Sequence, residues 1–269
     1  MGLIINFFLR RLLFEEKQHL GVGGLTWEGR CPQDFAVLPK RMFTRLRFQE
    51  ETIMQNNLLI RLETAEETTA VETLVREAFW NVYRPGCLEH YVLHCCRSHP
   101  DFVPELNLVL ERDGQLIGHV MYVRARLTAA DGRTIPVMTF GPLSILPEWQ
   151  GKGYGRLLLE TSMEKARAMG AAALCIEGDI GFYGPSGFVP GWTLGIDYAE
   201  EPAGVQVPYF LVKELTPGSL AGVKARYHTP ACYFVDEAQA EEFDKRFPPK
   251  EKRSRTVSCK FFSAQPAQG

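Results

Sequence analysis

The chain has 269 residues, of which 45% are hydrophobic and 11% aromatic, enough for one large domain or two small ones around a sizeable core. Its formal net charge of −2 gives no overall field that would attract nucleic acid or an anionic membrane, and no apolar run reaches the roughly 18 residues of a membrane span. The seven cysteines include no C-x-x-C pair, which argues against a disulfide framework or a zinc ribbon, so we expect a reducing, cytoplasmic location.

Regular patterning begins shortly after Met54. Residues 1–53 show no clean periodicity, and we expect them to be an appendage, translated from upstream of a native start at Met54. Residues 58–62 are typical of a strand. The segment from Thr64 onward is typical of a helix, because acidic residues fill its first turn and apolar residues recur at helical spacing. These apolar residues are Val71, Leu74, Val75 and Ala78.

The middle of the chain alternates turn sequences with extended segments. After a helical stretch at 87–98, the sequences Asp113-Gly114 and Ala130-Asp131-Gly132 predict turns between three antiparallel strands. The order of elements predicts a mixed α/β sheet with helices on both faces, in one domain at 58–235. We expect its strands at 58–62, 106–111, 116–127, 135–146, 173–177, 193–198 and 209–215.

The last part of the chain, residues 236–269, has a different composition. A charged helix is expected at 236–247, and the residues after Pro248-Pro249 are basic and polar. This composition favours a solvated, flexible tail over a contact with nucleic acid or a protein partner.

A glycine loop connects the strand at 135–146 to the next helix. Gly151, Gly153 and Gly155 have no side chains, so backbone N–H groups can close around phosphate oxygens at the positive end of that helix. The spacing excludes two other phosphate loops. Leu158 stands where a dinucleotide fingerprint needs its third glycine, and Lys152 is followed by glycine rather than serine or threonine. The loop therefore predicts a cofactor that carries a pyrophosphate.

Two ordered motifs carry a resemblance to a known family. The run Gln150-Gly151-Lys152-Gly153-Tyr154-Gly155-Arg156 resembles the acetyl-CoA loop of the GNAT N-acetyltransferase superfamily. The run Phe182-Tyr183-Gly184-Pro185-Ser186-Gly187-Phe188 resembles its F-Y-x-x-x-G-F segment. The resemblance implies the GNAT acyltransferase fold, in which a mostly antiparallel mixed sheet is splayed at the acetyl-CoA site and flanked by helices. It also implies acetyl-CoA as cosubstrate and no metal.

The resemblance further implies which residues hold the cosubstrate. Backbone N–H groups of Leu143, Ser144 and Ile145 would bind the pantetheine arm and the thioester oxygen. The loop from Gln150 to Arg156 would surround the pyrophosphate, with the Lys152 and Arg156 side chains adding charge at its edge.

The catalytic residues are predicted with unequal support from the motifs. Tyr183 matches the tyrosine that commonly protonates the departing thiolate in the family, and its phenol carries a proton at neutral pH. No family motif identifies the general base. Glu177, at the end of the strand that enters the site, is our candidate, with Asp179 and Glu148 as nearby alternatives.

A cluster of histidines and cysteines at 90–99 does not predict a metal site, because Tyr91 stands where a metalloprotease helix needs glutamate. If the resemblance holds, this helix borders the acceptor cleft instead. The residues that would then shape specificity are Tyr83, His90 and His94.

These features predict an acetyl-CoA-dependent N-acetyltransferase that moves an acetyl group to a primary amine, in a small molecule or a peptide, by direct attack on the thioester. The alternative is a non-catalytic acyl-CoA-binding or regulatory module, which would keep the loop without requiring Tyr183. Neither nucleic acid nor a membrane is an expected partner, and the strand edges permit a homodimer. The acceptor itself has no transferable motif.

Overall fold

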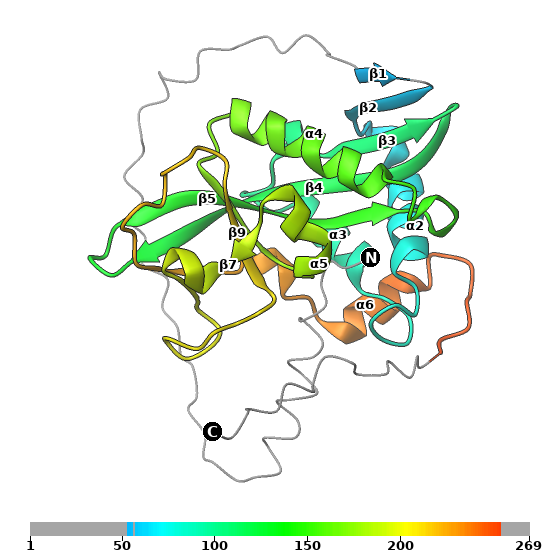
Figure 1. The fold of residues 1–269 in the computed structure, drawn as a ribbon. Helices are drawn as coiled ribbons and strands as arrows, with labels where there is room; N and C mark the ends of the chain where they lie inside the picture. Colours follow the sequence, from blue (N-terminus) through cyan, green and yellow to red (C-terminus); the bar gives the residue numbers. More distant parts are fainter. Residues whose placement is uncertain (1–52, 56, 254–269) are drawn as a thin grey trace, which may run out of the picture.

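The computed structural model describes residues 53–55 and 57–253, whose strands form one ten-stranded mixed sheet (Figure 1). The expected appendage, apart from Ile53, and residues 254–269 lie outside the described residues. The strands are β1 Ile53–Gln55, β2 Leu58–Leu62, β3 Leu108–Arg112, β4 Gln115–Ala129, β5 Thr134–Ile145, β6 Ala173–Glu177, β7 Val189–Pro190, β8 Ile196–Tyr198, β9 Phe210–Glu214 and β10 Ala225–His228. The α-helices are α2 Thr68–Phe79, α3 Glu89–Arg97, α4 Tyr154–Ala168, α5 Ile180–Tyr183 and α6 Glu237–Asp244. Short 3-10 helices are η1 Ala65–Glu67, η2 Pro104–Leu106, η3 Pro147–Trp149, η4 Gly184–Ser186, η5 Gly191–Leu194 and η6 Ala231–Tyr233.

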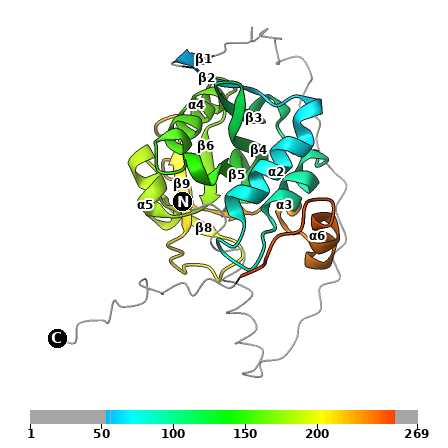
Figure 2. The same cartoon turned by 90° about the vertical axis from the view of Figure 1, so that its right-hand side faces the viewer.

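Helices cover both faces of the sheet. Figure 2 shows the sheet between α4 and α5 on one side and α2 and α3 on the other, with α6 outside α3. The apolar stripe of α2 is buried as its helical spacing predicts, and α4 buries Leu158, Leu159 and Met163 against the sheet. This arrangement confirms the predicted mixed α/β fold.

The strand order is β1-β2-β3-β4-β5-β6-β9-β7, with β10 and β8 attached beside β4. The predicted turn at Asp113-Gly114 joins β3 to β4, and the two longest strands, β4 and β5, pair from Gly118↔Ile145 to Thr128↔Thr134. Strand β6 is parallel to β5, but they are paired only at Met138↔Leu174. Beyond that position the two strands diverge, so the sheet is splayed between them.

The C-terminal third departs from the sequence prediction. A strand was expected at 193–198, but Gly191–Leu194 is a 3-10 helix and only Ile196–Tyr198 is extended. Strand β10 was not expected; it pairs antiparallel with β4 and parallel with β8. Its buried side chain Tyr227 stacks on Phe210 in a second, smaller core.

Helix α6 also corrects the prediction of a solvated tail. The helix exists, but Phe243 and Phe247 are buried, and both rings contact His90 of α3. Residues up to 253 therefore belong to the folded body, because burial of these aromatic rings stabilises the docked helix. Among residues 53–55 and 57–253, no helix has the length and hydrophobicity that crossing a membrane would require.

Candidate active site

The glycine loop before α4 leaves the N-terminus of that helix open. Gly151 and Gly153 have φ angles of +73° and +87°, in the left-handed region, and a Cβ added at either residue would meet nothing within 4 Å. Gly153 is the N-cap of α4, whose first turn contains no acidic residue and receives no side-chain cap. The unfilled backbone N–H groups and the positive end of the helix dipole can therefore face an anion.

Cationic and aromatic side chains surround this helix end. Lys152 Nζ and the Arg112 guanidinium carbon each lie 4.7 Å from the centre of the Trp149 ring. Arg112 also donates a hydrogen bond to the hydroxyl of Tyr154, the first residue of α4. Arg112 was missed in the sequence because it ends a strand 42 residues before Tyr154, and only the fold brings the two together. The Gln150 side chain donates to Ile145 O at 2.9 Å and so ties the loop to the end of β5.

The divergence of β5 from β6 lies directly before the loop. Leu143, Ser144 and Ile145 pair with β4 on one side, whereas β6 has already separated from the other side of β5. Since backbone groups of alternate residues point to opposite edges of a strand, part of this segment presents its N–H and C=O groups to the gap. The Ser144 hydroxyl is buried without a hydrogen-bond partner in the part of the chain that the structure describes.

Tyr183 lies in an aromatic cluster at the end of α5, with its ring 5.9 Å from Phe140 and 5.4 Å from Phe188, measured between centroids. The side chain is fully buried, and its hydroxyl has no hydrogen-bond partner among the described residues. Burial raises the pKa of Tyr183 well above its usual value, with smaller contributions from Tyr83 and Tyr122. The phenol therefore keeps its proton across the physiological pH range.

The backbone between Glu177 and Asp179 fixes where the Tyr183 ring lies. A Cβ added at Gly178 would stand 2.5 Å from Tyr183 Cε2 and 2.8 Å from Cδ2. Only glycine allows this close approach, and it holds the ring beside the end of β6, where the candidate base Glu177 stands. Asp179, an alternative base, instead caps α5 by accepting from Gly181 N at 2.9 Å. Glu148, the other alternative, is exposed.

Glu177 is held by residues from the C-terminal third of the chain. Its Oε1 accepts a hydrogen bond from the Tyr198 hydroxyl, which also lies 3.2 Å from Thr229 Oγ1. A second carboxylate, Glu200, accepts from Thr229 N at 3.2 Å, and its Oε2 is buried without a hydrogen-bond partner among residues 53–55 and 57–253. Burial raises the pKa of Tyr198, and the Glu177 and Glu200 charges raise it further. No local pattern in the sequence marks Tyr198, Thr229 or Glu200 as part of the candidate site.

The two histidines of α3 differ in exposure. His90 is fully buried under α6, so the expectation that it shapes acceptor specificity is wrong. His94 is exposed, with its ring centroid 4.5 Å from that of Phe243 and its Nδ1 3.0 Å from Glu72 Oε1, and its role in acceptor specificity stays a prediction. Within the described part of the chain, no group of three or more His, Cys, Asp or Glu residues is arranged to hold a metal ion.

The chain has an α/β fold of the GNAT type. It superposes with a TM-score of 0.54 on the GNAT family N-acetyltransferase YhbS from Escherichia coli, solved in complex with CoA, at 24% identity over 66% of this chain and 93% of that one. It superposes with a TM-score of 0.53 on a GNAT family acetyltransferase from Brucella melitensis, solved in complex with acetyl-CoA, at 22% identity over 67% of this chain and all of that one.

Sequence comparison finds similarity to the same family. Residues 72–188 match the acetyltransferase (GNAT) family. The Escherichia coli (strain K12) protein named "Uncharacterized N-acetyltransferase YjhQ" is 34% identical over 88 residues. That match covers 32% of this chain and 48% of YjhQ, so it spans about half the length of the curated relative.

Proposed function

We propose that the protein is an acetyl-CoA-dependent N-acetyltransferase that transfers the acetyl group to a primary amine of a small molecule or peptide by direct attack on the thioester. The observation that carries this proposal is the open N-terminus of α4 beside the divergence of β5 and β6. The two fold neighbours were solved with CoA and acetyl-CoA, and YjhQ is named as an N-acetyltransferase, which supports the assignment.

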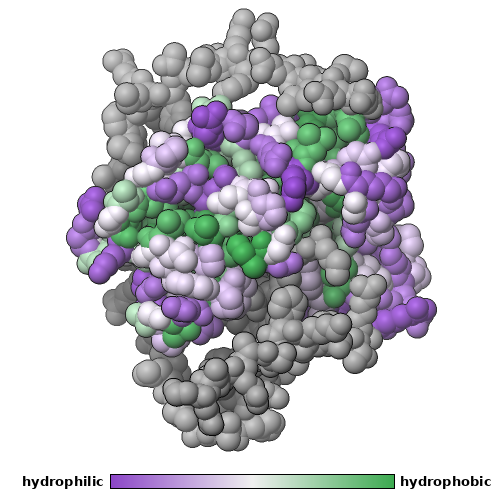
Figure 3. Space-filling model, viewed as in Figure 1, coloured by the Kyte–Doolittle hydropathy of each residue, from purple (hydrophilic) through white to green (hydrophobic). Residues whose placement is uncertain are grey.

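The cosubstrate would lie from the glycine loop into the splayed sheet. Backbone N–H groups of the loop at 150–156 would hold the pyrophosphate, with Lys152, Arg156 and Arg112 supplying positive charge. The edge of β5 at 143–145 would hold the pantetheine arm and the thioester oxygen. A positioned N–H donor to that oxygen is typically worth about 100-fold to 1000-fold in rate. Figure 3, viewed as in Figure 1, shows a band of hydrophobic residues across the middle of the molecule's surface. A hydrophobic band suits the apolar part of acetyl-CoA.

The reaction forms a C–N bond, breaks the thioester C–S bond and moves two protons. Glu177 would accept the proton that the amine loses on attack, and Tyr183 would donate its phenolic proton to the departing thiolate. The hydrogen bond from Tyr198 fixes the Glu177 carboxylate, and Gly178 fixes the Tyr183 ring. Both groups would then act beside the end of β6, where Glu177 stands and Gly178 contacts the Tyr183 ring.

A non-catalytic acyl-CoA-binding module is the second candidate. The full burial of Tyr183 favours it, because a proton donor must reach the departing sulfur. The two candidates share the glycine loop and differ in whether Tyr183 takes part in a reaction.

Coenzyme A release during incubation with acetyl-CoA and a broad panel of amines distinguishes the two. An N-acetylated product identified by mass spectrometry, with turnover lowered about 100-fold to 10,000-fold in Tyr183→Phe, supports the enzyme. Calorimetric binding of acetyl-CoA without turnover of any amine supports the binding module. Absence of acetyl-CoA binding contradicts both.

A further inference from the structure

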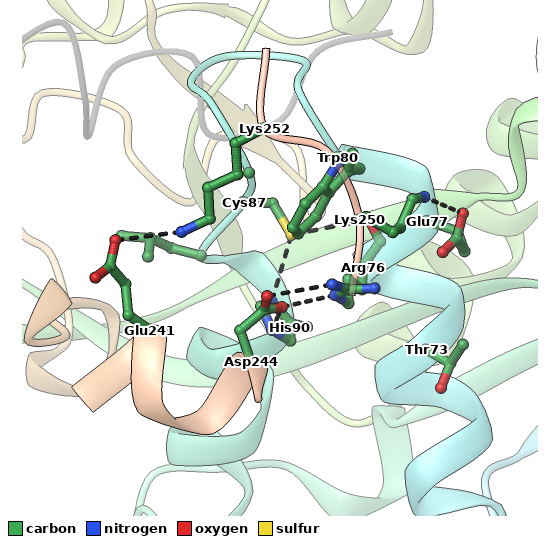
Figure 4. A network of polar contacts seen from close by, with 12 residues as sticks. Thr73, Arg76, Glu77, Trp80, Cys87, His90, Glu241, Asp244, Lys250 and Lys252 are labelled. Carbon is green, nitrogen blue, oxygen red and sulfur yellow. Dashed lines mark hydrogen bonds and ion pairs between the residues drawn. The ribbon is translucent and has the colours of Figure 1, made fainter. Parts of the chain in front are cut away.

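The segment after the second core folds back across the first helices of the domain. We call residues 237–253, which comprise α6 and the extended chain after it, the C-terminal strap. The strap crosses α2, α3 and the loop between them at 80–88, which we call the α2–α3 loop (Figures 2 and 4). Its contacts are too numerous and specific for a solvated tail.

Asp244 is the centre of the attachment. Its Oδ1 accepts a hydrogen bond from Arg76 Nε at 2.6 Å, and its Oδ2 accepts one from Arg76 Nη2 at 3.1 Å (Figure 4). His90 Nε2 lies 3.1 Å from Asp244 Oδ1. Arg76 is only 2% exposed and His90 is fully buried. Burial lowers the pKa of His90 to about 4, so the ring is neutral at pH 7 and Asp244 offsets the Arg76 charge. A buried guanidinium without this partner would be strongly unfavourable.

The rest of the strap holds the α2–α3 loop. Glu251 O accepts hydrogen bonds from Trp80 Nε1 and Asn81 Nδ2, both at 3.0 Å, and Arg253 N donates to Asn81 Oδ1 at 3.0 Å. Arg84 forms an ion pair with Glu237 at 2.8 Å. The strap therefore binds the loop at its beginning and at its middle.

The α2–α3 loop leads to the candidate proton donor. Tyr83, in the middle of the loop, packs against the main core, with its ring centroid 6.2 Å from that of Phe79. Tyr183 belongs to this same core, so Tyr83 and Tyr183 are parts of one packed cluster, and Tyr83 also contributes to the raised pKa of the Tyr183 phenol. A displacement of the loop would therefore reach the surroundings of the Tyr183 hydroxyl.

We propose that the C-terminal strap positions the α2–α3 loop for acetyl transfer, with Asp244 as the positioning residue that fastens the strap through its two hydrogen bonds from Arg76. This inference rests on the proposed N-acetyltransferase function. The strap would hold in place the loop beside Tyr183, on the side where the amine acceptor binds, and would not touch the glycine loop. Loosening the strap would therefore impair use of the amine and leave acetyl-CoA binding intact.

Cys87 and His90 also have the arrangement found in thiol nucleophiles, since Cys87 Sγ lies 3.4 Å from His90 Nδ1. Burial raises the pKa of the Cys87 thiol well above its usual value. The cavity that Cys87 lines with Trp80, Asp244 and Lys252 has a volume of about 10 Å³, room for about one water molecule. No substrate fits there, but the rate at which the buried Cys87 thiol is alkylated reports how often the strap opens.

The test compares three variants of the full chain. Asp244→Asn removes the charge that holds Arg76. Phe243→Ala loosens the same helix while leaving Asp244 in place, which matters because loss of the Asp244 charge would by itself lower the pKa of Cys87. Glu242→Gln is the control, since its side chain is 72% exposed and pairs with Lys245 inside the strap.

Alkylation of Cys87 by iodoacetamide, followed by peptide mass mapping, should be at least about tenfold faster in Asp244→Asn and Phe243→Ala and unchanged in Glu242→Gln. In both loosened variants kcat/KM for the amine should fall about 10-fold to 100-fold, as expected for a displacement of about 1 Å, with the Kd for acetyl-CoA within twofold of the parent. Unchanged alkylation, unchanged kcat/KM despite faster alkylation, or a parallel loss of acetyl-CoA affinity would each overturn the proposal. Failure of the proposed function itself is recognised separately, because the unsubstituted protein would then acetylate no amine.

Discussion

Replacing Gly178 by alanine tests whether the Tyr183 ring must lie where the structure places it. The added Cβ would stand 2.5 Å from Tyr183 Cε2, whereas non-bonded carbon atoms pack at about 3.5–4.0 Å, so the ring has to move by about 1 Å. Overpacking of this size typically costs about 1–3 kcal/mol of unfolding free energy. A misplacement of about 1 Å at a reacting group costs about 100-fold in rate.

We therefore expect Gly178→Ala to lower kcat about 100-fold while its Kd for acetyl-CoA stays within a few fold of the parent. Urea unfolding gives the stability change, and steady-state coenzyme A release gives kcat. Gly184→Ala is the matched control, because its Cβ would lie at an ordinary 3.4 Å from Ile180 Cδ1 and the residue has no positive φ. If Gly178→Ala is folded and turns over like the parent, the position of the Tyr183 ring does not limit the reaction.

Three further outcomes are expected. Gly153→Val, at a φ of +87°, should abolish acetyl-CoA binding measured by calorimetry at a stability cost of about 1–2 kcal/mol, and undiminished affinity would place the ligand elsewhere. Glu177→Gln should lose turnover at neutral pH and partly recover it near pH 9, where more of an amine with a pKa of about 10 arrives neutral; a pH profile that superimposes on the parent's would assign the base role to another group. Burial raises the pKa of Glu89 from 4.5 to about 7, so the folded state holds this proton more tightly than the unfolded chain does. The resulting stability, about 3 kcal/mol, is complete below about pH 4.5 and lost as the pH rises through 7. Urea unfolding of Glu89→Gln between pH 5 and 8 should lack that decline, and parallel curves for variant and parent would contradict it.

Local patterns in the sequence predicted the part of the site that is built from local structure. The apolar spacing of α2, the turn at Asp113-Gly114 and the glycine loop before α4 each depend on neighbouring residues, so their conformations could be inferred one at a time. The assignments of Leu143–Ile145 and Tyr183 came from the family resemblance, and that of Glu177 from its place at the end of a predicted strand; all remain predictions of function.

The remaining features depend on contacts between distant segments. Arg76 is one cation in a charged helix and has no sequence feature that marks it as buried; its partner Asp244 follows 168 residues later. Tyr198 and Thr229 reach Glu177 only because β10 is inserted between β4 and β8, and the four residues of β10 are too few for a clear period-2 pattern. Pairing partners of this kind are properties of the whole fold.

The bond between Arg76 and Asp244 also has a consequence for the order of folding during synthesis. While the chain is being made, α2 emerges from the ribosome long before the residue that neutralises its buried guanidinium. Contacts so far apart in sequence form late, because the chain between them must first be ordered. A nascent chain that ends before residue 244 would present Arg76, His90 and the apolar side of α3 uncovered, a state that invites association with other chains. Completion of the last helix is thus the event that converts an exposed, charge-unbalanced intermediate into the finished domain.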